Sequence, residues 1–190
     1  ETITVKSGAD GLVNLDDLRA KLGDDTAVFM ITNPNTLGLF EADIRAIAGA
    51  VHAAGGLVYL DGANMNAVIG TLQPAAQGVD LMHFNLHKTF STPHGGGGPG
   101  AGAIACTGAL APYLPAPLVE REVRPEGAVY RLDEDRPRSI GKLTAFHGNF
   151  ALLVRALAYL VRNGGDGLRD VSRHAVLSAN YVRARLAEKP

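Results

Sequence analysis

The residues best suited to chemistry lie between Asn85 and Gly100, in the stretch NLHKTFSTPHGGGGPG. They follow the run Val79–Phe84, which predicts a buried strand, so Lys88 stands just beyond a strand end. Burial lowers the pKa of a lysine, and a neutral amine is the form that attacks a carbonyl carbon. Four glycines, Gly95 to Gly98, follow and can bring backbone N–H groups close to a ligand. An exposed loop lysine beside an ordinary glycine-rich turn would give the same pattern, so a third residue is needed.

Asp61 is that third residue, at the end of a second apolar run, Gly56–Leu60. In open α/β sheets, ligands bind outside the carboxyl ends of the strands. The separation from Lys88, 88 − 61 = 27 residues, suits one strand–crossover–strand unit. An acid and a lysine on one sheet edge suit pyridoxal phosphate, because the acid keeps the ring nitrogen protonated and the lysine carries the aldehyde. Taken alone, Asp61 is equally well explained as a cap or turn residue.

Three longer motifs resemble one enzyme family. They are Leu60–Gly70 (LDGANMNAVIG), Ile31–Glu41 (ITNPNTLGLFE) and Met82–Gly102 (MHFNLHKTFSTPHGGGGPGAG). They resemble glycine dehydrogenase (decarboxylating), the P-protein of the glycine cleavage system, and the similarity continues through Arg136–Phe150 and His174–Tyr181. The resemblance implies part of a fold-type I, aspartate aminotransferase-like domain. Such a domain is α/β, with a mostly parallel sheet and helices on both faces, followed by C-terminal helices.

The resemblance also implies an activity, a cofactor and partners. Glycine would lose its carboxylate as carbon dioxide with pyridoxal 5'-phosphate as cofactor, and the aminomethyl group would pass to the lipoyl arm of the H-protein. A homodimer, or a heterotetramer with the other P-protein half, is implied, in bacterial cytoplasm or in a mitochondrial matrix. Family members are longer and take their phosphate-binding loop from an earlier segment. We therefore expect a fragment that by itself binds the cofactor poorly and is inactive.

Several alternatives stay open. The chain could be a non-catalytic fragment or pseudo-subunit that keeps the fold, or another fold-type I enzyme acting on amino acids. A glycine-rich module that binds phosphate or nucleotide without lysine chemistry is a third alternative.

The resemblance suggests roles for residues around the lysine. Ala63 stands two positions after the acid, where the superfamily packs a small residue on the ring, and Asn64 follows where some relatives have histidine. Asn35 lies in a turn like one that reaches the cofactor's phenolic oxygen, and Asn85 falls where relatives have a threonine near the phosphate or ring. His87 precedes Lys88 and is expected to help position it. The asparagines are equally good turn formers, and His87 would serve equally well as a structural histidine.

Composition excludes several classes of function. The net charge is −1, with 46% hydrophobic and 19% charged residues, so neither nucleic acid nor an anionic membrane surface is expected as a partner. The single cysteine, Cys106, excludes an internal disulfide and offers no thiolate cluster. No apolar run approaches the ~20 residues of a membrane span. The six histidines include no helically spaced pair with an acid between them, which disfavours a metal site.

Alternating strand and helix patterns predict a doubly wound, parallel sheet. Asn14 is expected to cap a short helix. A second helix, from about Phe40, should bury one face. The buried residues of that face are expected to be Ile44, Ile47, Ala48 and Val51. The strands are expected at Thr2–Val5, Ala27–Thr32, Gly56–Leu60, Val79–Phe84 and Ala101–Cys106.

We predict three segments along the chain. Residues 1–110 form the C-terminal part of the cofactor-binding large domain. Residues 111–142 carry five prolines and are expected to be an irregular connection. Residues 143–190 are expected to be helices that lead to a small domain, broken at Gly164-Gly165. The first of these helices, Ala151–Val161, is apolar around most of its circumference and is expected to be deeply buried.

Overall fold

The computed structural model describes residues 1–143 and 147–188. The chain divides into two compact units, residues 1–105 with 149–190, and residues 106–148. No helix in the described part of the chain is both long enough and apolar enough to cross a bilayer.

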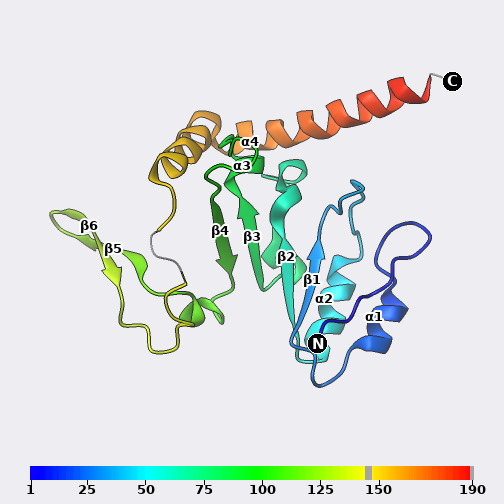
Figure 1. Ribbon diagram of the computed structural model, residues 1–190, viewed down its shortest axis with the longest axis horizontal. Helices are drawn as coiled ribbons and strands as arrows, with labels where there is room; N and C mark the ends of the chain where they lie inside the picture. The colour runs from blue at the N-terminus through cyan, green and yellow to red at the C-terminus, as the bar shows by residue number, and fades with distance from the viewer. Residues whose placement is uncertain (144–146, 189–190) are drawn as a thin grey trace. The chain divides into compact units, whose positions relative to one another are not determined.

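A four-stranded sheet forms the centre of the first unit (Figure 1). Its strands follow the order of the sequence, β1-β2-β3-β4. The first three are parallel, and the register places Thr32 opposite Asp61 and Asp61 opposite His83. The last strand runs the other way in Figure 1, and the Leu86 N–H donates to the Ala101 carbonyl oxygen beside it. The predicted α/β fold with a mostly parallel sheet is confirmed. The bounds are β1 Val28–Thr32, β2 Leu57–Asp61, β3 Leu81–Asn85 and β4 Gly102–Cys106.

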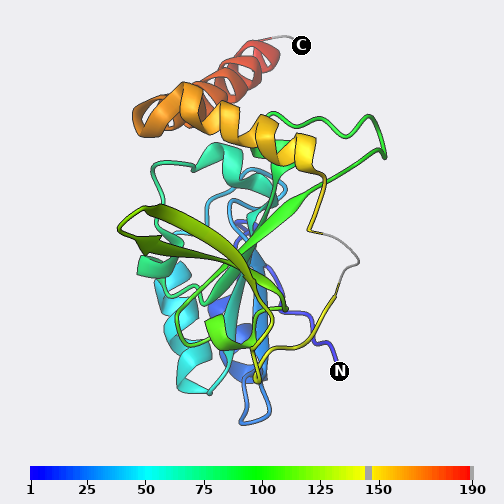
Figure 2. The same ribbon diagram turned by 90° about the vertical axis from the view of Figure 1, so that its left-hand side faces the viewer.

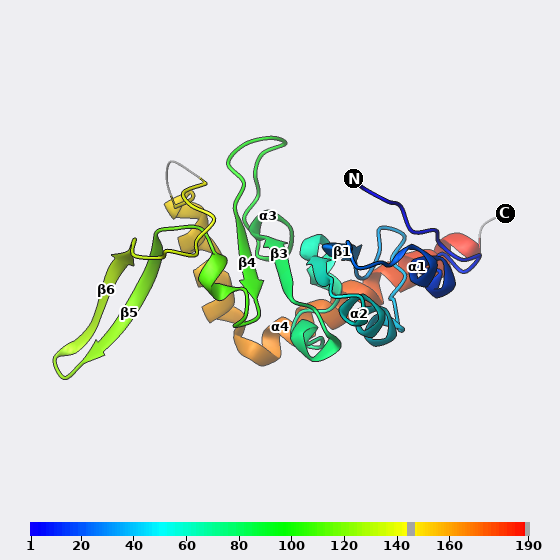
Figure 3. The ribbon, with the colours of Figure 1, turned by 90° about the horizontal axis from the view of Figure 1, so that it is seen from below.

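Helices α1 (Leu15–Lys21) and α2 (Ile44–Ala53) build the core against one face of the sheet. The predicted cap is present, since the Asn14 side chain accepts the Asp17 N–H at 2.9 Å. The short 3₁₀ helix η2 (Pro74–Gln77) lies beside α2. Figure 3 shows α2 to one side of the strands. The four residues predicted to form the buried face of α2 are all buried, because they recur at helical spacing. The core contains Leu18, Ile31, Ile44, Ile47, Ala48, Val51, Val58, Leu60, Val79 and Met82.

The opposite face of the sheet is open in the described chain. Successive strand side chains alternate between faces, so Val58 and Leu60 point into the core while Tyr59 and Asp61 point to the other side. Met30, on the same open face, is 59% exposed. Tyr59 and Asp61, on the same face, are half-buried.

The carboxyl edge of the sheet is covered by three helical segments. Short helices follow two of the strands, η1 (Gly62–Ala67) after β2 and α3 (Leu86–Thr89) after β3. The long helix α4 (Phe150–Ala187) runs across this edge (Figure 1). A second cluster of buried residues joins these segments, formed by Ile69, Leu86, Phe90 and Ala156.

Helix α4 corrects two expectations. It begins at Phe150 rather than near Leu143, and part of the predicted beginning, residues 144–146, lies outside the described residues. Its apolar first half is largely exposed, with Val161 at 75% and Leu157 at 59%, because the described residues pack against it on one side only. The predicted break is present: Gly164 has φ 62° and ψ −175°, and Figures 1 and 2 show the helix changing direction.

The second unit contains a hairpin where the sequence predicts irregular chain. Strands β5 (Leu118–Arg124) and β6 (Gly127–Asp133) pair antiparallel, and Arg131 bridges to Glu120 at 2.8 Å. A 3₁₀ turn, η3 (Ala111–Tyr113), precedes them. The prolines misled the prediction because they flank the strands or, like Pro125, lie in the turn, where no ladder N–H is needed. The bounds of the three predicted segments remain predictions.

The predicted first strand, Thr2–Val5, is wrong. These residues have no strand partner in the described chain, and the nearest ladder is an isolated bridge between Ser7 and Val13. Backbone groups next to the segment bond to α1 and its cap instead, since Lys6 N–H donates to the Asp17 carboxylate at 2.8 Å. A segment of alternating apolar and polar residues forms a strand only where a neighbouring strand is available to pair with it.

Candidate active site

The carboxyl ends of β1, β2 and β3 bring the predicted acid and lysine to one edge of the sheet. Thr32 ends β1, Asp61 ends β2, and Lys88 lies in α3 directly after β3. Parallel strands place their carboxyl ends together, and this edge is where open α/β sheets bind ligands. Asp61 and Lys88, the two residues best suited to chemistry, therefore follow neighbouring strands at the sheet edge where the sequence predicts them.

The Asp61 carboxylate is held from two directions. Its Oδ1 accepts the Ala63 N–H at 2.9 Å, so Asp61 caps η1. The same oxygen lies 3.3 Å from Nε2 of His83. Its side chain remains 24% exposed, and within the described residues no hydrogen bond to Oδ2 is found. One carboxylate oxygen is thus fixed and the other is available to a ligand.

The Lys88 side chain is exposed, which differs from the buried environment expected from the sequence. The reason is helical geometry: Leu86 and Phe90 point into the second cluster and Thr89 is also buried, so the position between them points outward. No hydrogen bond or ion pair of its ammonium group is found within the described residues. The amine is therefore accessible to a carbonyl compound.

His87 and Asn85 flank the lysine. The Nδ1 atom of His87 is buried without a hydrogen-bond partner in the described chain, and its ring lies edge-on to His94 with centroids 4.7 Å apart. Asn85 is half-buried at the N-cap position of α3, and its side chain makes no capping bond. In the described chain, the Nδ1 atom of His87 therefore has no hydrogen-bond partner and the Asn85 side chain makes no capping hydrogen bond.

Asn35 and Asn64 line one small cavity of about 270 Å³ together with residues of α4. The Asn35 side chain already makes three hydrogen bonds: its Oδ1 accepts from Leu37 and Leu39 N–H at 3.0 Å each, and its Nδ2 donates to the Gly11 carbonyl oxygen. Asn64 Nδ2 donates to the Pro34 carbonyl oxygen at 2.9 Å. The structure thus brings both predicted residues together and gives each a role in turn structure. Ala63 lies between Asp61 and Asn64 on η1.

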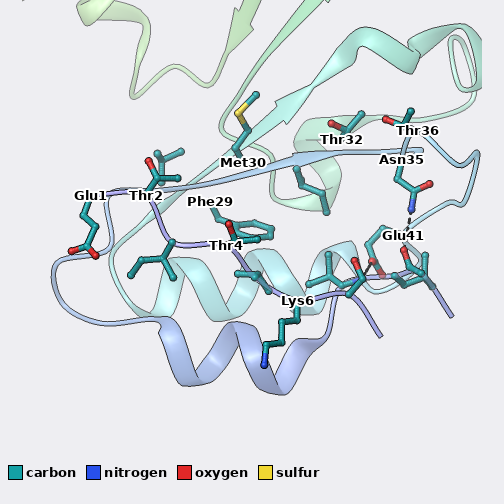
Figure 4. Close-up of a pocket in the computed structure, with 18 residues that line it drawn as sticks. Glu1, Thr2, Thr4, Lys6, Phe29, Met30, Thr32, Asn35, Thr36 and Glu41 are labelled. Atoms are coloured by element: carbon teal, nitrogen blue, oxygen red, sulfur yellow. Dashed lines mark hydrogen bonds between the residues drawn. The ribbon is translucent and has the colours of Figure 1, made fainter. Parts of the chain in front are cut away.

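A second hollow, of about 640 Å³, lies along β1 (Figure 4). The N-terminal segment runs beside β1 there, and the lining includes Thr2, Thr4 and Lys6 from that segment and Phe29 and Met30 from the strand. Its lining includes Asn35 and does not include Asp61 or Lys88. The hollow is therefore separate from the acid and lysine of the carboxyl edge.

The glycine loop is exposed. Gly95, Gly96 and Gly97 all have positive φ, and the Gly97 N–H donates to the His94 ring. Across residues 1–143 and 147–188, no group of three or more His, Cys, Asp or Glu side chains is arranged to hold a metal ion.

Sequence reasoning missed His83. This residue lies opposite Asp61 on the neighbouring strand, and the Tyr59 hydroxyl lies 2.6 Å from its Nδ1. A histidine at the polar position of an otherwise apolar strand, facing the same side as the acid, was the signal available. Finding it required the register between β2 and β3.

Residues 2–105 match the family Aminotransferase class-V, which is more than half of the chain. The chain therefore belongs to the class-V aminotransferase family, whose members depend on pyridoxal phosphate.

Curated relatives are more specific. The chain is 53% identical over 189 residues to a "Probable glycine dehydrogenase (decarboxylating) subunit 2" of Chlorobium phaeobacteroides, covering 100% of this chain and 39% of that protein. A protein of the same name from Halalkalibacterium halodurans is 54% identical over 187 residues, covering 98% of this chain and 38% of that protein. The chain thus spans about two fifths of the length of the curated relatives it matches.

Among solved structures, the chain is similar to a glycine decarboxylase (P-protein) of the glycine cleavage system in inhibitor-bound form. The TM-score is 0.74 at 29% identity, over 90% of this chain and 40% of that one. A cysteine desulfurase from Thermococcus onnurineus gives a TM-score of 0.60 at 18% identity, over 98% of this chain and 45% of that one, and so shares the fold alone.

Proposed function

We propose that the protein containing this chain decarboxylates glycine with pyridoxal phosphate and passes the remaining aminomethyl group to the lipoyl arm of a carrier protein. The observation that carries the proposal is the placement of Asp61 and Lys88 at the ends of neighbouring strands on one sheet edge. The names of the curated relatives, glycine dehydrogenase (decarboxylating) subunit 2, support the choice of substrate.

The residues present fit the cofactor. The Lys88 amine is exposed and uncommitted, Oδ2 of Asp61 is open in the described chain, and Nδ1 of His87 is buried without a partner. A carboxylate, an amine and an unpaired imidazole on one edge are groups that a phosphorylated pyridine aldehyde would engage. When bound, pyridoxal phosphate supplies an electron sink for the electron pair left behind as carbon dioxide departs.

Lys88 would hold the cofactor covalently through its amine, and Asp61 would keep the ring nitrogen protonated through a charge-assisted hydrogen bond. Because Oδ1 of Asp61 is held by the Ala63 N–H, the carboxylate is oriented before any ligand arrives. Preorganised charge of this kind acts without reorganisation during the reaction.

The remaining predicted residues surround these two groups. Ala63 would pack on the ring face, Asn64 would approach the phenolic oxygen or the substrate, and Asn35 would approach the phenolic oxygen. Asn85 would lie near the phosphate or ring, and His87 would position the lysine. The hydrogen bonds that Asn35 makes within its turn leave it less free for this role than Asn64, which makes one.

The partner proteins belong to the same proposal. The name "subunit 2" carried by the relatives supports assembly with a second P-protein subunit, as a heterotetramer, with a homodimer as the alternative. A lipoylated H-protein would accept the aminomethyl group. The assembly is tested on the full-length protein that contains this chain, called the full chain below. It would be purified with and without a co-expressed first subunit, and its molecular mass in solution would be determined.

The activity is tested by exchange of labelled carbon dioxide into the carboxyl group of glycine. The full chain would be assayed with its first subunit, lipoylated carrier and pyridoxal phosphate, and Lys88→Ala would serve as the catalytic control. Exchange that requires Lys88 supports the proposal. A folded, cofactor-loaded wild type without exchange would contradict it.

A further inference from the structure

Three side chains on the open face of the sheet, Tyr59, His83 and Asp61, contact one another in that order. Asp61 is the acid proposed to bind the ring nitrogen of the cofactor. The Tyr59 hydroxyl lies 2.6 Å from Nδ1 of His83, and Nε2 of the same ring lies 3.3 Å from Oδ1 of Asp61. The rings of Tyr59 and His83 are 5.7 Å apart between centroids. The two nitrogens of His83 thus face two different oxygen atoms.

The register of the sheet produces this arrangement. Asp61 and His83 are direct partners across β2 and β3, and Tyr59 precedes Asp61 by two residues on the same face. Side chains that are direct neighbours on adjacent strands lie within contact distance. The contact is therefore set by backbone pairing rather than by a flexible loop.

The direction of the hydrogen bond between Tyr59 and His83 depends on the Tyr59 hydroxyl. Burial, and secondarily the charge of Asp61, raise the pKa of the Tyr59 hydroxyl above its usual value, so it remains protonated. A protonated phenol can donate to Nδ1, and when it does, His83 is neutral and carries its proton on Nε2. Nε2 is the ring nitrogen that lies 3.3 Å from Oδ1 of Asp61.

We infer that His83 is a positioning residue for the proposed reaction: kept by Tyr59 as the Nε2–H tautomer, it contacts one oxygen of Asp61 and orients the carboxylate so that the other oxygen meets the cofactor ring nitrogen. The inference rests on the proposed function. His83 would act on the cofactor through the Asp61 carboxylate. It shares that carboxylate oxygen with the Ala63 N–H, so Asp61 is fixed from two neighbouring segments.

A second histidine–aspartate pair provides a matched comparison in the same protein. His52 Nε2 lies 2.8 Å from Asp80 Oδ2, and the same oxygen accepts the Val58 N–H at 2.7 Å. This pair links α2 to the opposite end of β2, away from the carboxyl edge. It should matter for the fold alone.

The first test needs no cofactor. In the unliganded full chain with nitrogen-15-labelled histidine, NMR should find the proton of the neutral His83 ring on Nε2, assigned by the signal lost in His83→Gln. In Tyr59→Phe that tautomer preference should decrease. A proton on Nδ1, or a preference unchanged in Tyr59→Phe, would overturn the inference.

The second test compares two amides that differ in reach. In His83→Gln the amide extends to the position of Nε2 and can still donate to Asp61. In His83→Asn it reaches only the position of Nδ1, beside Tyr59. Pyridoxal phosphate affinity, followed by the absorbance of the bound cofactor, should fall about tenfold or more in His83→Asn, because the contact that orients the Asp61 carboxylate is lost. It should stay within about threefold of wild type in His83→Gln and be unchanged in His52→Gln.

The outcomes separate the two claims. Equal affinity in His83→Asn and His83→Gln, whether both are weak or both like wild type, would overturn the positioning role while the proposed function stood. A wild type that binds no pyridoxal phosphate at Lys88 would contradict the proposed function, and the NMR measurement would still decide the Tyr59–His83–Asp61 arrangement. Circular dichroism of each variant confirms that it is folded before comparison.

Discussion

The side-chain amide of Asn64 donates a 2.9 Å hydrogen bond to the carbonyl oxygen of Pro34, thirty residues earlier in the chain. This bond ties η1, which follows Asp61, to the turn that follows β1. The two segments would otherwise be independent loops on the edge of the sheet. Their connection holds the approach to Asp61 in a defined shape.

Replacing Asn64 with alanine should therefore lower the free energy of unfolding. The loss should be about 1 kcal/mol, the usual contribution of one hydrogen bond. Urea unfolding of the full chain measures it. Asn180→Ala is the control, because in the described chain that exposed side chain donates to the Val176 carbonyl oxygen of its own helix. Equal stability of wild type and Asn64→Ala would show that the bond contributes nothing.

Lys88 should be the residue that carries the cofactor. Borohydride reduction of the full chain with pyridoxal phosphate, followed by peptide mapping, should find the pyridoxyl group on Lys88. The label should disappear in Lys88→Ala and persist in Lys142→Ala, since Lys142 is an exposed lysine of the other unit. A pyridoxyl group on another lysine in the wild type would contradict the assignment.

Asp61→Asn should keep the fold and lose most of the activity. Asparagine keeps the oxygen that caps η1 at Ala63, so stability should change little. Its neutral amide cannot stabilise a protonated ring nitrogen, and a lost hydrogen bond to a charged group costs about 1.5–3 kcal/mol. Carbon dioxide exchange should fall about ten- to a hundredfold. Wild-type exchange in this variant would refute the role of Asp61.

Gly62→Ala should destabilise the protein by about 1–3 kcal/mol, because overpacking displaces backbone that cannot move freely. A Cβ atom at Gly62 would overlap the His83 carbonyl oxygen, so η1 would have to move away from β3. Gly49→Ala in the exposed face of α2 is the control, since a Cβ there meets nothing within 4 Å. Thermal unfolding should show a lower midpoint for Gly62→Ala only.

Asp17 should make stability depend on pH. Its hydrogen bond with Lys21, and secondarily the Lys6 N–H, hold the pKa of the Asp17 carboxyl below its usual 3.8. A depressed pKa in the folded state stabilises above the unfolded value, and the contribution is lost as the pH falls through the folded value. The stability difference between wild type and Asp17→Asn should be constant near neutral pH and shrink below about pH 4.

Urea unfolding across this pH range measures the difference. Asp16→Asn is the matched control, because the Asp16 side chain is 95% exposed and lies 3.6 Å from Arg19. Its effect should be small at every pH. A difference for Asp17→Asn that grew toward acid pH would contradict the assignment.

The sequence alone predicted the elements that depend on local patterns. The face of α2 appeared as apolar residues at helical spacing, and Asn14 was visible as a cap because its bond to Asp17 spans three residues. The break at Gly164 was equally local. The hairpin of residues 118–133 was missed because the prediction rested on the number of prolines. These prolines lie outside the paired strands, where they do not interrupt the ladder.

The acid and the lysine at strand ends were also visible in the sequence, since parallel strands bring their carboxyl ends together whatever the details of packing. The environment of these residues was not visible. Lys88 is exposed because its neighbours take the inward positions of α3, and Asn35 uses three bonds in its own turn. Both outcomes depend on which side chains compete for the interior.

The Tyr59–His83–Asp61 chain was decided by tertiary structure alone. Tyr59 and His83 are 24 residues apart, and a shift of one residue in the pairing of β2 with β3 would turn His83 to the other face. The sequence therefore determined the class of fold and the chemical groups at the edge of the sheet. The register between strands decided which groups touch, because contact across a sheet is fixed by backbone pairing, which no local pattern specifies.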